Sequence, residues 1–166
     1  MTSLTSDGRA GQRCASQWLG PLCHINHGSG ATSVSSSIPS FNASDADVYE
    51  RFMARWSTRM ADPFLTFVGV KAGQRVLDVG CGTGTVTLAL ANRGCEVVGM
   101  DASEPYLEGA RRLRSHTSIV YEYGDARSLT YPVASFDACV SLLAIDVVLE
   151  PDTVVAEMRR VQEQCI

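Results

Sequence analysis

Residues 76–84 read Val-Leu-Asp-Val-Gly-Cys-Gly-Thr-Gly, and this stretch decides the fold. An apolar run broken only by Asp78 favours a buried strand, and it leads directly into three glycines at alternate positions. Glycine lacks a Cβ, so Gly80, Gly82 and Gly84 permit unusual dihedral angles and let backbone N–H groups approach a bound molecule at the start of a helix. The stretch therefore predicts a strand, a tight turn that lies against a ligand, and a helix.

Strand and helix patterns alternate along the chain after this turn. We expect strands over 75–79, 96–100, 118–123 and 136–142. Helices are expected over 85–93, closed by Gly94, over 105–114, capped by Ser103, and over 152–163. Strands separated by helices imply right-handed crossovers. The predicted fold class is therefore α/β, with a Rossmann-like parallel sheet.

The segment before the first strand predicts a helix with an aromatic face. Ser44 or Asp45 can cap this helix. Its large side chains recur at i, i+3, i+4 and i+7, and they are Tyr49, Phe52, Met53 and Trp56. Such a face either packs against the domain or forms a lid over a bound ligand. A second, short helical segment is expected to start at Pro63 and to end at Gly69.

The first 43 residues differ in composition from the rest. They are rich in Ser, Thr and Gly, carry one acid, Asp7, and show neither helical nor strand periodicity. We expect a disordered leader over 1–43 and one domain over 44–166. Cys23, His24 and His27 lie close together in the leader, but their spacing matches none of the usual zinc patterns, so we expect no metal site.

Composition and charge exclude several classes of protein. The net charge is -4, and Lys and Arg are scattered singly, which argues against a nucleic-acid partner. The longest apolar runs, such as 142–145, fall far short of the roughly 20 residues of a membrane-spanning helix, so we expect no membrane partner. Six cysteines without a Cys-x-x-Cys pair fit reduced thiols and a cytoplasmic location.

The spacing of the glycines distinguishes two kinds of nucleotide site. In the dinucleotide fingerprint the third glycine follows the second by three residues, whereas Gly84 follows Gly82 by two. An acid at position 78 followed by Gly-x-Gly-x-Gly resembles the first motif of class I S-adenosylmethionine-dependent methyltransferases of the small-molecule, type 11-like group. That resemblance implies S-adenosyl-L-methionine as the cofactor. It also implies that Asp78 orients the methionine part, and that Gly80, Cys81 and the following glycines lie against the cofactor.

Further motifs resembling that family follow in order. Asp101, at the end of the second strand and about 20 residues beyond the first glycine, is expected to accept both ribose hydroxyls, with Ala102 beside it. The alternative role of Asp101 is a helix cap. The resemblance places Asp125 and Ala126 at the adenine, where the carboxylate would accept from the exocyclic amine. A carboxylate in a turn is also common without any ligand.

The resemblance extends to the fourth strand and to the N-terminal helix. It implies that Ser141 and Leu142 line the cofactor where the site opens towards the methyl acceptor. Asp146 stands where related enzymes contact the acceptor, so it is a substrate-binding candidate, and the alternative is a capping or solvent-facing carboxylate. The resemblance also implies that Tyr49 belongs to a helix that covers the cofactor.

Methyl transfer from a sulfonium needs little protein chemistry. The cofactor supplies both the electrophile and the leaving group, so the protein positions the reactants and no catalytic nucleophile is expected. The family's sheet has the order 3-2-1-4-5-7-6, and its pattern continues past the end of this sequence. We therefore expect a partial methyltransferase domain over 44–166 that lacks the last strands. The open edge at the fourth strand would then favour self-association.

Three functions follow from these patterns. The first is S-adenosylmethionine-dependent methyl transfer to a small-molecule acceptor by in-line displacement. The second is a truncated, non-catalytic fragment that binds S-adenosylmethionine. The third, a nicotinamide-binding Rossmann domain, is disfavoured by the glycine spacing.

Overall fold

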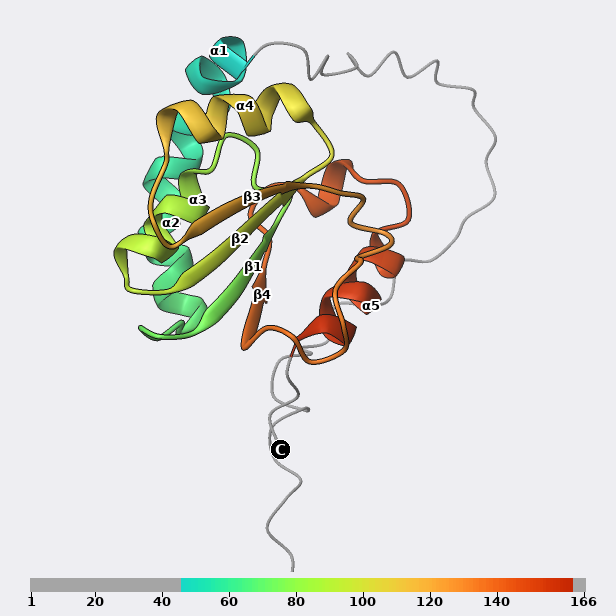
Figure 1. The fold of residues 1–166 in the computed structure, drawn as a ribbon. Helices are drawn as coiled ribbons and strands as arrows, with labels where there is room; N and C mark the ends of the chain where they lie inside the picture. Colours follow the sequence, from blue (N-terminus) through green and yellow to red (C-terminus); the bar gives the residue numbers. More distant parts are fainter. Residues whose placement is uncertain (1–45, 163–166) are drawn as a thin grey trace, which may run out of the picture. The chain divides into compact units, whose positions relative to one another are not determined.

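A computed structural model describes residues 46–162, which contain a parallel sheet of four strands (Figure 1). The strands are β1 (Arg75–Val79), β2 (Glu96–Asp101), β3 (Ile119–Tyr123) and β4 (Ala138–Val140), in the spatial order β3-β2-β1-β4. All three pairings are parallel. The predicted α/β class and Rossmann-like sheet are confirmed. The predicted leader over 1–43 and the predicted caps Ser44 and Asp45 lie outside the described residues.

Alternating residues of the central strands give the sheet two buried faces. Helices α2 (Arg55–Val68) and α3 (Thr85–Asn92) cover one face, and α5 (Pro151–Val161) covers the other (Figure 1). Val76 of β1 packs with Leu65 and Leu90 on the first face. Leu77, the next residue of β1, packs with Val154 on the second. The sheet is therefore the centre of a three-layer arrangement with a core on each side.

Helix α2 is continuous through Pro63, so the predicted start of a separate helix at that residue is wrong. A proline inside a helix removes one backbone hydrogen bond and costs about 3 kcal/mol. Ala61 and Leu65, which flank Pro63 one turn apart, are buried in the core shared with α3. Their burial keeps the helix continuous. The predicted end is confirmed, because Gly69 adopts φ +75° and its N–H donates to the carbonyl of Leu65 at 3.1 Å.

The predicted aromatic face is divided by a π-helical turn. α1 (Ala46–Tyr49) leads into the π-helix η1 (Glu50–Ala54), which joins α2 without a gap. A π-helical turn is wider than an α-helical turn, so residues three apart no longer share a side. Tyr49 and Met53 are half-buried, whereas Phe52 and Trp56 are 65% and 59% exposed. The expectation that all four lie on one face is wrong.

The remaining helices follow the sequence patterns. In α4 (Glu104–Leu113) the predicted cap is present, since the Oγ of Ser103 accepts a hydrogen bond from the N–H of Tyr106 at 3.4 Å. Gly94 follows the end of α3 with φ +86°, as expected for a closing glycine. A short 3-10 helix, η2 (Ile145–Val147), precedes α5. None of the helices within 46–162 is long and apolar enough to cross a membrane.

The fourth strand is shorter than predicted. Only residues 138–140 pair with β1, and Phe136 instead makes an isolated bridge with Gln162. Asp137 accepts a hydrogen bond from the N–H of Arg75 at 2.6 Å. β4 pairs only with β1 among the described strands, and self-association through its other edge stays a prediction.

A buried polar pair joins β1 to α3. The Oγ1 of Thr87 donates to a carboxylate oxygen of Asp78 at 2.6 Å, and neither residue is more than 1% exposed. Burial raises the pKa of Asp78 to about 7, with a smaller contribution from the charge of Asp101 and against the lowering effect of the Thr87 hydrogen bond. The protonated and ionised forms of this carboxyl are therefore both populated near neutral pH.

This pKa predicts that Asp78 makes the domain less stable as the pH rises from about 4 to about 7. In the unfolded chain the carboxyl loses its proton near its ordinary pKa of 3.8, but in the folded domain it keeps the proton until about pH 7. The unfolded state thus binds fewer protons in this window, and stability falls by up to about 1.4 kcal/mol per pH unit. Above both pKa values the contribution is constant.

The measurement is urea unfolding between pH 4 and pH 8 for the natural chain and for Asp78→Asn. The variant should lack this component, so its stability relative to the natural chain should grow as the pH rises to 7. A difference between the two proteins that stays constant across this range would contradict the raised pKa.

Candidate functional site

The glycine-rich turn after β1 is held by hydrogen bonds to the end of β2. The N–H groups of Gly80 and Cys81 both donate to the carbonyl oxygen of Met100, at 2.8 and 3.0 Å. The N–H of Gly82 donates to a carboxylate oxygen of Asp101 at 2.8 Å. The sequence predicts that N–H groups of this turn approach a ligand, and that contact stays a prediction. These three N–H groups already have acceptors inside the protein, so a molecule beside the turn would meet a fixed backbone surface.

Two tyrosines lie against the same turn. A Cβ added to Gly82 would lie 2.7 Å from the hydroxyl oxygen of Tyr49, and a Cβ on Gly84 would overlap the hydroxyl of Tyr121. Gly80, Gly82 and Gly84 have φ values of +72°, +55° and +86°, where other residues are strained. Both the backbone conformation and the available space therefore require glycine here.

Asp101 presents a partly buried carboxylate at the C-terminal end of β2. One oxygen accepts from Gly82, and the other accepts from the N–H of Ser103 at 2.9 Å. Burial raises the pKa of Asp101, although hydrogen bonds from Gly82, Ser103 and Ala102 lower it. Each carboxylate oxygen can accept further hydrogen bonds. The two backbone donors fix the orientation of the carboxylate and leave it able to receive two ligand hydroxyls.

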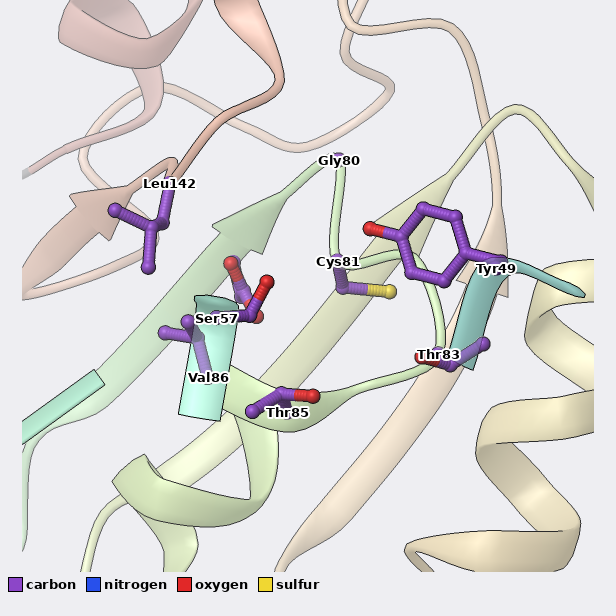
Figure 2. Close-up of a pocket in the computed structure, with 9 residues that line it drawn as sticks. Tyr49, Ser57, Gly80, Cys81, Thr83, Thr85, Val86 and Leu142 are labelled. Atoms are coloured by element: carbon purple, nitrogen blue, oxygen red, sulfur yellow. The ribbon is translucent and has the colours of Figure 1, made fainter. Parts of the chain in front are cut away.

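A recess of about 280 Å³, which includes space open to solvent, lies beside the turn (Figure 2). Its walls come from the end of α1, from α2, from the end of β1 and the glycine-rich turn, from the start of α3 and from the segment after β4. The lining residues are Tyr49, Ser57, Asp78, Gly80, Cys81, Thr83, Thr85, Val86 and Leu142. The recess therefore lies at the carboxyl ends of the strands, where open α/β sheets bind ligands.

Two hydroxyl groups near the recess are buried without a hydrogen-bond partner among the described residues. They are the Oγ of Ser141, which precedes the lining residue Leu142, and the Oγ1 of Thr83. The Thr83 hydroxyl is still close enough to Glu50 to contribute to lowering the pKa of that carboxyl. A buried hydroxyl without a partner costs about 1–3 kcal/mol. A ligand that bonds to Ser141 would remove this cost.

Tyr49 forms a wall of the recess directly above Gly82. Its ring packs against the ring of Tyr106, with centroids 4.5 Å apart. Burial and the charge of Asp101 raise the pKa of Tyr49 to about 12. The hydroxyl is therefore protonated at neutral pH and can donate a hydrogen bond to a ligand oxygen. Tyr49 packs against the domain, as one of the two interpretations of the aromatic helix expects, and its role as a cover over a ligand stays a prediction. Neither interpretation fits the exposed Phe52 and Trp56.

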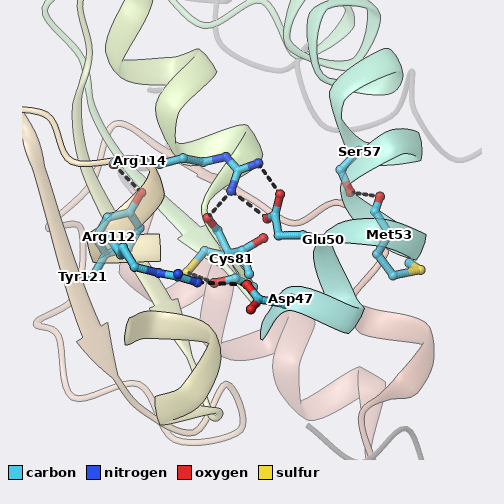
Figure 3. A network of polar contacts seen from close by, with 10 residues as sticks. Asp47, Glu50, Met53, Ser57, Cys81, Arg112, Arg114 and Tyr121 are labelled. Carbon is cyan, nitrogen blue, oxygen red and sulfur yellow. Dashed lines mark hydrogen bonds and ion pairs between the residues drawn. The ribbon is translucent and has the colours of Figure 1, made fainter. Parts of the chain in front are cut away.

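An ion pair fastens the helical segment that carries Tyr49 to the rest of the domain (Figure 3). The guanidinium of Arg114 binds both carboxylate oxygens of Glu50, at 2.7 and 2.9 Å, and donates to the carbonyl of Thr83 at 3.0 Å. The Arg114 and Glu50 side chains are only 14% and 23% exposed. Burial raises the pKa of Glu50, but the bond from Arg114 outweighs it and the net shift is downward. Arg114 thus connects η1, α4 and the glycine-rich turn.

Several predicted site residues lie away from the recess. Asp125 is exposed, and Arg127 binds its carboxylate at 2.7 Å and lowers its pKa to about 2. Asp146 is exposed in η2, and Ala102 is exposed beside Asp101. Ala126 packs against the core on the α5 face. The proposed contacts of these residues with adenine, ribose or acceptor stay predictions.

Sequence reasoning missed part of the recess wall. Thr83 lies between two glycines of the motif, and Thr85 follows the last one. The glycine motif was therefore the signal that these two residues lie at the site. Ser57 comes from α2, and its spacing of eight from Tyr49 was the signal that the two share a side. Arg114, at the end of α4, gave no signal in the sequence, because its contact with Glu50 spans 64 positions.

Asp78 is the titratable carboxyl that lines the recess, and it is buried and bonded to the hydroxyl of Thr87. Burial raises the pKa of the Cys81 thiol well above its usual value, so the thiol is neutral. No group of three or more His, Cys, Asp or Glu side chains able to hold a metal is found in residues 46–162. Cys23, His24 and His27 lie outside these residues. The arrangement therefore fits the binding and positioning of a ligand.

Comparison with known proteins agrees with this geometry. Residues 77–164 match a family described as a methyltransferase domain. Over 91 residues the chain is 41% identical to the demethylmenaquinone methyltransferase of Clavibacter sepedonicus, a match that covers 54% of this chain and 37% of that protein.

Two solved structures illustrate the structural likeness. The S-adenosylmethionine-dependent methyltransferase of Mesorhizobium loti superposes with a TM-score of 0.56 at 31% identity, covering 61% of this chain and 48% of that one. The [4+2]-cyclase SpnF superposes with a TM-score of 0.60 at 30% identity, covering 64% and 41%. The chain spans less than half the length of the curated relatives it matches. The family match extends over more than half of this chain, which therefore belongs to the class I S-adenosylmethionine-dependent methyltransferases.

Proposed function

We infer that this chain binds S-adenosyl-L-methionine and takes part in methyl transfer to a small-molecule acceptor. The observation that carries the proposal is the carboxylate of Asp101, fixed beside the Gly82 turn at the end of β2, in a chain that matches the methyltransferase domain. A carboxylate at this place suits two vicinal ribose hydroxyls. The unpartnered hydroxyl of Ser141 and the protonated hydroxyl of Tyr49 add polar groups for the same ligand.

The residues that line the recess would share the work of holding the cofactor with Asp101, Ala102 and Ser141, which lie outside its lining. Asp101 would accept the ribose hydroxyls, with Ala102 against the sugar. The glycine-rich turn, Cys81 and Asp78 would lie along the methionine part, with Tyr49 as its cover. Ser141 and Leu142 would lie where the cofactor meets the acceptor.

Two further roles depend on residues outside the recess. Asp125 and Ala126 would contact the adenine. Because Arg127 binds the Asp125 carboxylate, that contact requires the arginine to share or release it. Asp146 would contact the acceptor.

The chemistry of the reaction asks little of these side chains. S-adenosylmethionine, when bound, supplies a methyl group on a sulfonium that is already a good leaving group. The protein then has to hold the donor and acceptor in line and exclude water. The neutral Cys81 thiol and the buried Asp78 suit a site that positions reactants.

The names of some relatives support a proposal for the acceptor class. The matched proteins include methyltransferases named for demethylmenaquinone, for ubiquinone biosynthesis and for phosphatidylethanolamine. We infer a small, lipid-soluble acceptor and, as the thiol pattern predicts, a cytoplasmic site of action. A second candidate is cofactor binding without methyl transfer, because the likeness to a [4+2]-cyclase links this fold to a protein named for another reaction.

Calorimetric titration of the chain with S-adenosylmethionine, with NAD as the control ligand, tests the proposal. Saturable binding of S-adenosylmethionine alone is expected. Incubation with demethylmenaquinone and the cofactor, followed by mass spectrometry, then separates the two candidates, because methyl transfer adds the mass of one CH2 group. Binding of NAD in place of S-adenosylmethionine would contradict the proposal.

Replacing Asp101 should weaken cofactor binding strongly. Asp101→Asn removes the charge that strengthens the two hydrogen bonds to the ribose, and such bonds contribute about 1.5–3 kcal/mol each. We expect at least a tenfold loss of affinity in the same titration. The matched control is Asp137→Asn, which changes a carboxylate that also accepts a backbone N–H but lies at the opposite edge of the sheet. Equal effects of the two substitutions would remove Asp101 from the site.

The ion pair between Glu50 and Arg114 should affect binding indirectly. Glu50→Gln and Arg114→Gln each loosen the segment that carries Tyr49, and we expect each to weaken cofactor affinity several-fold. Because both changes break the same contact, the double variant should be little worse than either single variant. Additive losses in a double-mutant cycle would show that the two residues act separately. The control is Arg112→Gln, which removes the exposed pair with Asp47.

A further inference from the structure

The outer side of η1 and α2 presents apolar side chains to solvent. Phe52, Trp56 and Met60 follow each other at intervals of four, and they are 65%, 59% and 39% exposed. Side chains four apart lie on one side of a helix. A continuous row of large apolar side chains is unusual on a protein surface and marks a site of interaction.

Each of these apolar residues follows an arginine. The sequence repeats Arg51-Phe52, Arg55-Trp56 and Arg59-Met60, which places a row of arginines beside the apolar row. All three arginines are exposed. Among the described residues none of them forms an ion pair. We call these six residues the arginine–apolar face.

The acids of the same segment do not neutralise this face. Asp47 pairs with Arg112, Glu50 pairs with Arg114, and Asp62 pairs with Arg93. These three partner arginines belong to other elements. Arg112 lies in α4, Arg93 follows α3 and Arg114 follows α4. The segment's own arginines thus keep their charge for an external anion.

We propose that the arginine–apolar face docks on the surface of a bilayer that contains anionic lipids. Apolar side chains next to cationic ones are the combination that inserts at the boundary between headgroups and acyl chains, with the guanidinium groups on lipid phosphates. A tryptophan in such a row has its preferred place at that boundary. The N-terminal 43 residues are a poor alternative occupant, because they carry a single acid to meet three arginines. An acidic protein is the competing partner, and the test distinguishes it.

This proposal revises the expectation that the chain has no membrane partner. That expectation followed from the absence of long apolar runs, which bears on spanning a bilayer and not on lying at its surface. The same segment has two uses, because Tyr49 and Ser57 line the recess from its inner side. Surface docking stands on exposure and charge alone and does not depend on the proposed methyl transfer.

Vesicle binding of the full chain tests the proposal. The chain has two tryptophans, Trp18 and Trp56, so Trp18→Phe leaves Trp56 as the only reporter. With vesicles of phosphatidylcholine and phosphatidylglycerol we expect co-sedimentation and a blue shift of Trp56 fluorescence, both weakened by high salt. Vesicles of phosphatidylcholine alone should bind much less.

Two sets of substitutions in that background locate the contact. R51Q/R55Q/R59Q should weaken partitioning about fivefold for each arginine removed, roughly a hundredfold in total. F52Q/M60Q should remove most of the fluorescence shift. The matched control is V133Q/V155Q/R159Q, which changes exposed apolar and basic residues elsewhere. Since all these side chains are exposed, thermal unfolding should change little, and this is measured alongside.

Two outcomes would overturn the proposal. The first is vesicle binding that the control variant loses as much as the variants of the face. The second is no binding to anionic vesicles by a folded chain, together with saturable binding of an acidic polypeptide such as polyglutamate, which would assign the face to a protein partner.

Discussion

The carbonyl oxygen of Met100 accepts two N–H groups from the turn that follows β1, and the next residue, Asp101, accepts a third through its carboxylate. These bonds join the end of one strand to the loop after its neighbour. Because parallel strands end at the same edge, the end of β2 lies within reach of the turn, whose glycines take positive φ values. The position of the recess, the orientation of Asp101 and the packing of two tyrosines on the turn all depend on this arrangement.

The sequence predicted the parts of the fold in which local pattern and tertiary packing agree. β1 was predicted at its observed bounds, because a buried strand that leads into a glycine turn has few alternatives. The predictions failed where long-range contacts decide. Burial of Leu65 carries α2 through Pro63, and β4 extends only as far as β1 pairs with it.

The site shows the same division. Asp78, Gly80 and Cys81 of the glycine motif were predicted as site residues, and so, by resemblance, were Tyr49 and Leu142. Thr83 of the same motif lines the recess but was missed. The bond between Arg114 and Glu50 was not, since it joins residues 64 positions apart and neither belongs to a motif. Asp125 illustrates the opposite case. Its position in the chain fits the family pattern, but the nearby Arg127 occupies its carboxylate in a way that spacing alone cannot reveal.

The π-helical turn between Glu50 and Ala54 sets the rotational register of the N-terminal segment. An α-helix turns by about 100° per residue, so loss of one residue here would restore regular winding and rotate everything before it by that angle. Tyr49 would then leave Gly82 while the core behind α2 stayed intact. Relatives that differ by one residue in this short stretch would therefore carry the same side chains around a differently shaped binding site, and insertions or deletions here would alter ligand preference without altering the fold.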